Sequence, residues 1–468
     1  MTESTGIEID STALRERLPR PHLPAHPRWE ALYWRAWELG ARMVRQGTPS
    51  NRFAPQYVDA AFGGNIFQWD TCFIAAFARY SNELLPVRPA LDNFYSRQEP
   101  DGYIAREYRW ENGAPLWAKG SGDSCNPPLF AWAEWLLYSV HGDVGRLQQV
   151  WRHLDGYYRW LIANRRLPNG LYWITDMGSG MDNTPRYGAA WTDYSIQQAL
   201  NARVMQQIAQ ILGDSAASTF YQHEHASLSE QINRLMWDEA AGFYWDLDAG
   251  DLPVPAYSVA AFWALLAEIA SPAQAAKLIA QLRDPQRFWR THPFPTLAAD
   301  ERWFKPYGDY WLGAVWAPTN YMIIRGLHSY AAHDFAREAS ARHLDAMCDV
   351  LDATGTIWEN YRPDEMAPGT PARPDFVGWS GLGPIALLIE SILGIELDRP
   401  SLTVRWLLPH EPGGIDNLPW ADGPLDLHCG ATALTVRSAS PLTLEITDGT
   451  QRRRVELSAG EHTLERTP

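Results

Sequence analysis

The chain has 468 residues, of which 46% are hydrophobic and 20% charged, so it can bury a large core without staples. Its 40 Lys and Arg against 55 Asp and Glu give a net charge of -15, which argues against nucleic acids and anionic membranes as partners. Residues 1–20 contain no apolar leader core, and no apolar run is long enough to span a bilayer. A cytoplasmic location is therefore the default expectation.

Segments with helical hydrophobic periodicity follow one another along most of the chain. The predicted helices are residues 29–46, 67–80, 87–97, 127–140, 144–164, 191–212, 216–236, 256–270, 272–282, 310–327, 330–351 and 381–393. Pro318 predicts a kink or a late start for the segment 310–327.

The connections between these helices alternate between long and short. Long ones begin after residues 46, 97, 164, 236, 282 and 351, and short ones are 81–86, 141–143, 213–215, 271 and 328–329. Because short links join antiparallel neighbours, all the long loops should emerge at one end. About twelve helices with one elaborated rim predict an all-α fold, the (α/α)6 barrel, over residues 1–398.

Residues 399–468 change character. The stretches 402–407, 433–437, 442–447 and 453–457 alternate apolar and polar residues between turns. We expect a small antiparallel β module packed on the barrel.

Cysteine and histidine offer no cofactor site. Cys72, Cys125, Cys348 and Cys429 are far apart, which predicts buried free thiols. His223 and His225 are spaced i,i+2 on a predicted helix and do not share a face. We expect no metal and no other cofactor.

Two carboxylates stand on long loops. Asp182 lies in MGSGMDNTPR, residues 177–186, where Gly180 and its neighbours form irregular backbone that can approach a ligand. An Asx turn is the structural alternative. Glu359 lies in IWENYRPD, residues 357–364. A carboxylic acid that protonates a leaving oxygen and a carboxylate that activates water are what hydrolysis of a glycosidic bond requires. We assign Asp182 as the acid and Glu359 as the base, with Arg186 binding substrate or backbone rather than Asp182.

Other loop residues are candidates for sugar contacts. Asp70, beside Trp69, could bind sugar hydroxyls or serve only as a first-turn helix acid. Asn126 is most simply an N-cap, with a ligand contact second. Many of the 23 Trp fall in Gly- and Pro-rich loops, where flat rings can stack on sugars, although core packing is the commoner role of a Trp. The remaining candidates are Gln98, Arg106, Trp311, Trp316, Trp358, Tyr361 and Trp379.

The loop motifs together resemble glycoside hydrolase family 63 and its trehalase relatives. Besides MGSGMDNTPR, the motifs are FQWDTCF, QEPDGYIARE, SCNPPLFAW, YWLGAVWAPTNY, IWENYRPD and FVGWSGLGP, in the family's order. The compact length is most similar to the bacterial mannosylglycerate and glucosylglycerate hydrolases. The resemblance implies an inverting α-glycosidase on an (α/α)6 barrel, with the acid at Asp182, the base at Glu359 and about 6.5 to 9.5 Å between the carboxyls.

The chain departs from the family pattern in two places. Leu312 stands where the family commonly has Arg, and the C-terminal β module is not typical of the shortest members. The expected partner is therefore a small carbohydrate, either a glucoside or a mannoside, whose leaving group stays open. Glycerate would call for an Arg, with Arg106, Arg186 and Arg362 as candidates, or for Lys305. A sugar epimerase working through histidines and a non-catalytic sugar-binding protein are the alternatives, although His292 is almost the only histidine in the long loops.

Overall fold

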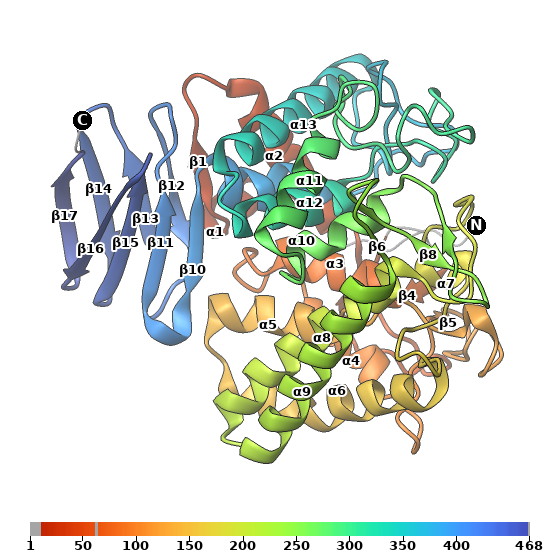
Figure 1. Ribbon diagram of the computed structural model, residues 1–468. Helices are drawn as coiled ribbons and strands as arrows, with labels where there is room; N and C mark the ends of the chain where they lie inside the picture. The colour runs from red at the N-terminus through yellow and green to blue at the C-terminus, as the bar shows by residue number, and fades with distance from the viewer. Residues whose placement is uncertain (1–10, 61–63, 467–468) are drawn as a thin grey trace.

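The computed structural model describes residues 11–60 and 64–466, in which a helical body carries a β module at one end (Figure 1). The first ten residues, which contributed to the expectation that the chain has no leader, lie outside this range. The helices are α1 (Ser11–Arg17), α2 (Pro27–Ala41), α3 (Gln68–Ala78), α4 (Val87–Tyr95), α5 (Phe130–His141), α6 (Val144–Arg165), α7 (Asp176–Ser179), α8 (Thr192–Leu212), α9 (Ser215–Leu235), α10 (Trp263–Leu266), α11 (Pro272–Leu282), α12 (Ala317–Ser329) and α13 (His333–Thr354). Short 3-10 turns are η1 (Gly122–Ser124), η2 (Val259–Phe262), η3 (Ser380–Leu382) and η5 (Arg399–Ser401), and η4 (Gly383–Ile392) is a π-helix.

Six helical segments contact one another in a closed cycle. The cycle runs from α3 to α5, α8, α10, α12 and η4, and η4 contacts α3 again. Every residue of α3 is buried, and nine of the ten residues of η4 are buried, from Gly383 to Ser391. By contrast, α9 packs on α8 and buries only Tyr221, Leu228 and Ile232. The core of the helical body therefore lies inside this cycle, since helices that are apolar on all sides need neighbours all round.

The short connections use local capping chemistry. Gly213 ends α8 in the left-handed conformation, and the Asp214 side chain accepts a hydrogen bond from the backbone N–H of Ala217 at the start of α9. Ser271 and Gln274 form a capping box at the start of α11. Such reciprocal bonds satisfy N–H groups that the helix leaves open, so consecutive helices can reverse direction within a few residues.

The sequence predicted most of these helices within a few residues. Helix α12 starts late, with Pro318 in its first turn, as that residue indicated. Two segments differ in type, because residues 256–270 form η2 and the short helix α10, and residues 381–393 form η3 and the π-helix η4. Cys72, Cys125, Cys348 and Cys429 are free and buried, which confirms the expectation for them.

The C-terminal module consists of two sheets. Its strands are β10 (Ile395–Asp398), β11 (Thr403–Leu407), β12 (Gly413–Leu418), β13 (Leu425–Cys429), β14 (Ala433–Ser438), β15 (Leu442–Asp448), β16 (Gln451–Leu457) and β17 (Gly460–Glu465). One sheet has the order β10-β11-β15-β16, and the other has the order β1-β12-β13-β14-β17. The sheets are mostly antiparallel as expected, but β11 and β15 run parallel.

The second sheet takes its edge strand from the beginning of the chain. Strand β1 (Arg20–His22) pairs antiparallel with β12, so that His22 lies opposite Gly414. Strand β10 begins four residues before the boundary expected at residue 399. The β module is thus larger than the segment 399–468, because it includes one strand from each side of the helical body.

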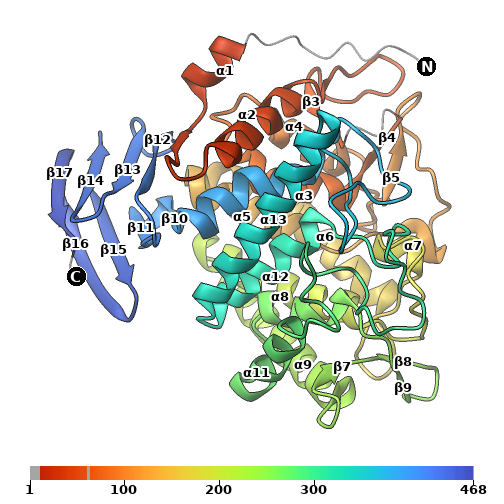
Figure 2. The ribbon, with the colours of Figure 1, turned by 90° about the horizontal axis from the view of Figure 1, so that it is seen from above.

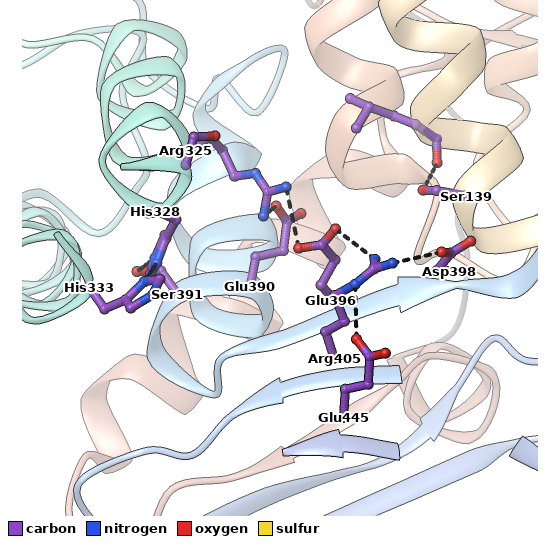
Figure 3. A network of polar contacts seen from close by, with 12 residues as sticks. Ser139, Arg325, His328, His333, Glu390, Ser391, Glu396, Asp398, Arg405 and Glu445 are labelled. Atoms are coloured by element: carbon purple, nitrogen blue, oxygen red, sulfur yellow. Dashed lines mark hydrogen bonds and ion pairs between the residues drawn. The ribbon is translucent and has the colours of Figure 1, made fainter. Parts of the chain in front are cut away.

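The β module meets the helical body through a polar network (Figure 3). Glu390 of η4 binds Arg79, Tyr80, Tyr321 and Arg325, while Arg405 of β11 binds Glu396, Asp398 and Glu445. The Arg325 Nη2 lies 3.9 Å from the Glu396 Oε2 and joins the two groups. Two adjoining cavities of about 740 and 730 Å³ share Arg325, Glu390, Glu396 and Arg405 in their linings, and neither is lined by Asp182 or Glu359.

The loop-rich end of the body lies away from the β module. Helix α7 and the short strands β4 (Asn65–Phe67), β5 (Glu107–Arg109) and β8 (Asp246–Leu247) gather there (Figures 1 and 2). The remaining short strands are β2 (Val44–Arg45), β3 (Tyr57–Val58), β6 (Trp237–Asp238), β7 (Phe243–Tyr244) and β9 (Pro253–Val254). Among the described residues, no helix is both long enough and apolar enough to cross a bilayer.

Candidate active site

Asp182 projects from the tight loop that follows the one-turn helix α7 in sequence. The Thr175 hydroxyl caps this helix by accepting a hydrogen bond from the Gly178 N–H, and Gly180 ends it with φ of +83°. A Cβ atom at Gly180 would lie 2.4 Å from the Trp69 ring. The acid loop thus rests directly on the first turn of α3, and only glycine fits at the contact.

Burial dominates the electrostatics of Asp182. Burial raises the pKa of this carboxyl to about 6. The charge of Arg106 acts to lower this pKa, and the charges of Asp176 and Glu107 act to raise it further. The Arg106 Nη2 lies 3.5 Å from the Asp182 Oδ1, and the Asp182 side chain stays 33% exposed. Asp182 therefore holds its proton up to a higher pH than an ordinary aspartate does while it remains open to a ligand.

Glu359 is buried in the loop after α13 and accepts two hydrogen bonds. The Tyr310 hydroxyl donates to its Oε1 at 3.2 Å, and the Arg373 backbone N–H donates to its Oε2 at 3.1 Å. Burial raises the pKa of Glu359 to about 7, while Arg373 and the Tyr310 bond lower it by less and Asp182 adds to the rise. The two hydrogen bonds fix the carboxyl group in one orientation.

Tyr310 belongs to a segment, residues 309–311, that contacts both carboxylate-bearing loops. Its pKa is raised chiefly by burial and further by the negative charges of Glu359, Asp182 and Asp70. Asn183, next to Asp182, donates to the Asp309 carbonyl at 3.1 Å and accepts from the Trp311 N–H at 2.8 Å. The acid loop therefore clasps the segment that carries Tyr310. Tyr310 and Asn183 were not among the residues predicted from the sequence, although each stands beside one that was.

Asp70 and Arg106 complete the charged group. Both side chains are buried, and the charge of Arg106 acts on both Asp70 and Asp182. In the described part of the chain, the Asp70 Oδ1 and the Arg106 Nε and Nη1 have no hydrogen-bond partner. Buried polar atoms without partners are costly, so these three atoms are suited to bind a polar ligand.

Comparison with known proteins identifies the family of this chain. The mannosylglycerate hydrolase MGH1-like glycoside hydrolase domain matches residues 64–380, a range that contains Asp182 and Glu359. The chain belongs to this family of glycoside hydrolases. It is accordingly a glycosidase.

Relatives of this glycoside hydrolase extend over different shares of it. An uncharacterized protein of Borreliella burgdorferi is 33% identical over 366 residues, covering 75% of this chain and 77% of the relative. The mannosylglycerate hydrolase of Thermus thermophilus is 35% identical over 131 residues, or 27% of this chain and 29% of that enzyme. The crystal structure of a GH63 mannosylglycerate hydrolase from Thermus thermophilus in complex with glucose superposes with a TM-score of 0.62 at 20% identity, covering 76% of this chain and 99% of that chain.

Four of the predicted tryptophans form one aromatic cluster in the glycoside hydrolase. Trp311 and Trp316 stack with ring centroids 4.0 Å apart, Trp69 lies 5.8 Å from Trp311, and Trp379 lies 5.4 Å from Trp316. Trp316 is 0% exposed and Trp311 is 1% exposed, so their rings pack against protein rather than lie open to a sugar. This cluster supports Gly180 and hence the acid loop.

The structure gives Arg186 a different role from the expected one. Its guanidinium donates two hydrogen bonds of 2.8 Å to Asp193, and others of 2.8 and 2.9 Å to Asp246. It also lies over the Trp191 ring, 4.7 Å from the centroid. Arg186 does not pair with Asp182, as predicted, but its donors are occupied by buried carboxylates instead of substrate.

Asn126 and Gln98 hold loops in place. Asn126 does not cap α5; its Nδ2 donates to the Gly178 carbonyl at 3.0 Å, while its Oδ1 has no partner among the described residues. Gln98 donates to the carbonyls of Gly102 and His153, and its Oε1 contacts His153 Nδ1. Asn126 thus supports the acid loop, whereas Gln98 supports a turn and is not free to bind a ligand.

Trp358 and Tyr361 lie close to Glu359 in sequence, but their side chains make hydrogen bonds within the protein. The Trp358 indole donates to the Thr354 hydroxyl at the end of α13. The Tyr361 hydroxyl accepts the Trp358 backbone N–H at 3.1 Å, and its ring is 1% exposed. Both side chains shape the loop that carries Glu359. The buried Tyr361 ring offers no face to a sugar, whereas a sugar contact from the half-buried Trp358 stays a prediction.

Proposed function

We propose that this glycosidase inverts the anomeric carbon of a small α-linked glucoside or mannoside, with Asp182 as general acid and Glu359 as general base. The arrangement that carries the proposal is the pair itself, whose two loops both contact the segment 309–311. The cycle of α3, α5, α8, α10, α12 and η4 supports an (α/α)6 barrel. Along the chain its members alternate with α2, α4, α6, α9, α11 and α13, apart from the one-turn helix α7 between α6 and α8.

The roles follow from the surroundings of each carboxyl. Asp182 is partly exposed on a loop and has one cation beside it, so it can reach the glycosidic oxygen and protonate the leaving group. Glu359 is buried and oriented by two donors, so it can accept a proton from a water that attacks the anomeric carbon. Inversion requires a water between the two carboxyls, and each carboxyl makes its own contacts with the protein.

The pair shares one proton near neutral pH. Burial raises the pKa of both carboxyls, to about 6 for Asp182 and about 7 for Glu359. The reaction uses the arrangement with the proton on Asp182 and Glu359 ionised. The singly protonated pair therefore includes the reactive form, and a substrate bound between the two carboxyls favours that form.

Arg106 favours a leaving group that carries a carboxylate. Of the candidate cations for a glycerate, Arg186 is bound to two aspartates, and Arg362 binds the Pro368 carbonyl and Glu365. Arg106 keeps two unpartnered nitrogens close to Asp182. Because relatives include a mannosylglycerate hydrolase, mannosylglycerate and glucosylglycerate are the first substrates to test, beside neutral α-glucosyl disaccharides.

The decisive experiment follows hydrolysis of these α-linked substrates by proton NMR. We expect the β-anomer of the released sugar to accumulate first. Asp182→Asn and Glu359→Gln should each lower kcat by roughly a hundredfold to ten-thousandfold, whereas Glu365→Gln, an exposed acid on the same loop as Glu359, should leave it unchanged. Release of the α-anomer, or full activity of either variant, would contradict the mechanism. Binding without turnover across the panel would favour a sugar-binding protein.

A further inference from the structure

A second group of polar side chains lies in the β module, outside the site described above. The His22 Nε2 contacts the Asp416 Oδ2 at 2.8 Å, and the His428 Nε2 contacts the Asp416 Oδ1 at 2.7 Å. The three ligand atoms that these residues offer lie within 4.8 Å of one another. No step of the proposed hydrolysis uses them.

The sheet register places these three side chains on one face. His22 of β1 lies opposite Gly414 of β12, and Gly414 in turn lies opposite His428 of β13. Asp416 follows two residues after Gly414 on the same strand, so its side chain points to the same face. Three neighbouring strands therefore hold the group, and the backbone positions of the ligands are fixed before any ion arrives.

Gly414 makes the convergence of the two histidines possible. A Cβ atom at this position would lie 2.3 Å from the His428 Nδ1. The His428 ring lies over the bare backbone of β12, and its centroid is 5.2 Å from that of His22. With the Nδ1 of His428 against β12, its Nε2 is the nitrogen that faces Asp416.

The chemistry of the group matches a transition-metal ion. We infer that His22, Asp416 and His428 bind one divalent transition-metal ion, with Zn²⁺ as the best match, and that this ion fastens β1 to the C-terminal β module. Two imidazole nitrogens and one carboxylate oxygen suit Zn²⁺ and its neighbours better than Ca²⁺ or Mg²⁺, which prefer all-oxygen sites. His22 is half-exposed, so water can take the fourth position.

The local charges are compatible with a cation. Asp416 supplies the carboxylate of the group, and its two oxygens face the two imidazole nitrogens. Arg20 is the nearest competing cation, 3.8 Å from the Asp416 Oδ2 on a side chain that is 42% exposed. A long exposed side chain can move aside when an ion binds.

Zinc and cobalt titrations of the untagged, EDTA-treated full chain test this inference. We expect one equivalent of Zn²⁺ by calorimetry, and one equivalent of Co²⁺ with the visible absorption of a four-coordinate ion that Zn²⁺ abolishes. A hundredfold excess of Zn²⁺ over its Kd should raise the Tm by about 3 °C.

Matched variants separate the site from incidental binding. His22→Gln and His428→Gln should each weaken Zn²⁺ binding at least tenfold and lose the increase in Tm. His462→Gln, a histidine of β17 in the same sheet whose Nε2 contacts the Ser458 carbonyl, should bind Zn²⁺ like the natural chain. Circular dichroism confirms folding of each variant. Failure of the natural chain to bind one equivalent, or equal binding by the His22 and His428 variants, would overturn the inference. Glycosidase activity is not a readout, so the two proposals stand or fall separately.

Discussion

The ionisation of two carboxyl groups sets the expected pH dependence of the glycosidase. With pKa values of about 6 for Asp182 and about 7 for Glu359, kcat/KM should follow a bell whose maximum lies between these values. Below the lower value both carboxyls are protonated and no base is left, and above the higher value both are ionised and no acid is left. Initial rates in a buffered series that spans both values test this. A profile that keeps rising above pH 8 would exclude the pair as the acid and base.

Tyr310 is the residue whose contribution is easiest to isolate. Tyr310→Phe keeps the ring and removes the hydrogen bond to the Glu359 Oε1. Because a bond to a charged acceptor contributes about 1.5–3 kcal/mol, we expect kcat/KM to fall roughly ten- to a hundredfold. The bond also lowers the pKa of Glu359, so the alkaline limb of the pH profile should move to higher pH. A purely structural role would reduce stability and leave that limb in place.

The same substitution should mainly reduce stability at Arg186 and mainly reduce activity at Arg106. Arg186→Met strands the buried carboxylates of Asp193 and Asp246, and we expect it to lower the free energy of unfolding by roughly 3–5 kcal/mol. Arg106→Met removes a side chain with two unpartnered nitrogens, so it should impair activity far more than stability. Chemical denaturation beside steady-state kinetics separates the two effects. Equal loss of stability in both variants would contradict the division of roles.

The position of the acid loop depends on its contact with helix α3. Gly180→Ala places a Cβ atom against the Trp69 ring, which should cost about 1–3 kcal/mol and displace Asp182 enough to lower kcat more than tenfold. Gly213→Ala is the matched control, since Gly213 also has positive φ, +74°, but nothing within 4 Å of the added atom. The control should lose about 1 kcal/mol and keep its activity. Comparable kcat losses in both would show that strain alone, rather than the contact, is responsible.

Helices with a clear apolar stripe were predictable, whereas elements defined by distant partners were not. Helices α6, α8 and α9 lie within a residue or two of their expected bounds, because periodicity and the Gly-Asp links are local signals. Strand β1 is only three residues long, contains Pro21 and has no strand pattern of its own; its conformation is set by pairing with β12. The π-helix η4 is buried on nearly all sides, so its type could not be read from an apolar stripe.

The site shows the same limit. Asp182, Glu359, Asp70 and Arg106 were recognisable as charges on unusual loops, and the structure brings these four together. The assignment of Arg186 was wrong because one of its partners, Asp246, lies 60 residues further along the chain. Tyr310 was missed because its backbone, with φ of +54°, turns the hydroxyl toward Glu359 in a way that no local pattern specifies.

In the whole molecule, the candidate active site and the β module are separate. Helix α7, which the Asp182 loop follows, lies at the loop-rich end, and the β module lies at the other (Figure 1). Deleting residues 1–26 removes β1 and uncovers the edge of β12, so we expect self-association and a lower Tm. The KM of the remaining monomer should stay within about twofold, because the deletion lies far from Asp182. Size-exclusion chromatography and kinetics on the monomer fraction measure both effects. A stable monomer with a much higher KM would show that the ends are coupled.

The pairing of β1 with β12 also has a consequence for how the chain is made on the ribosome. His22 and Asp416 are 394 positions apart, so at about 5–20 residues per second β1 has to wait roughly 20–80 s for its partner to emerge. During that interval the nascent helical body can already assemble, while its first strand is left without a neighbour. A chain that terminates before β12 would keep that strand permanently unpaired.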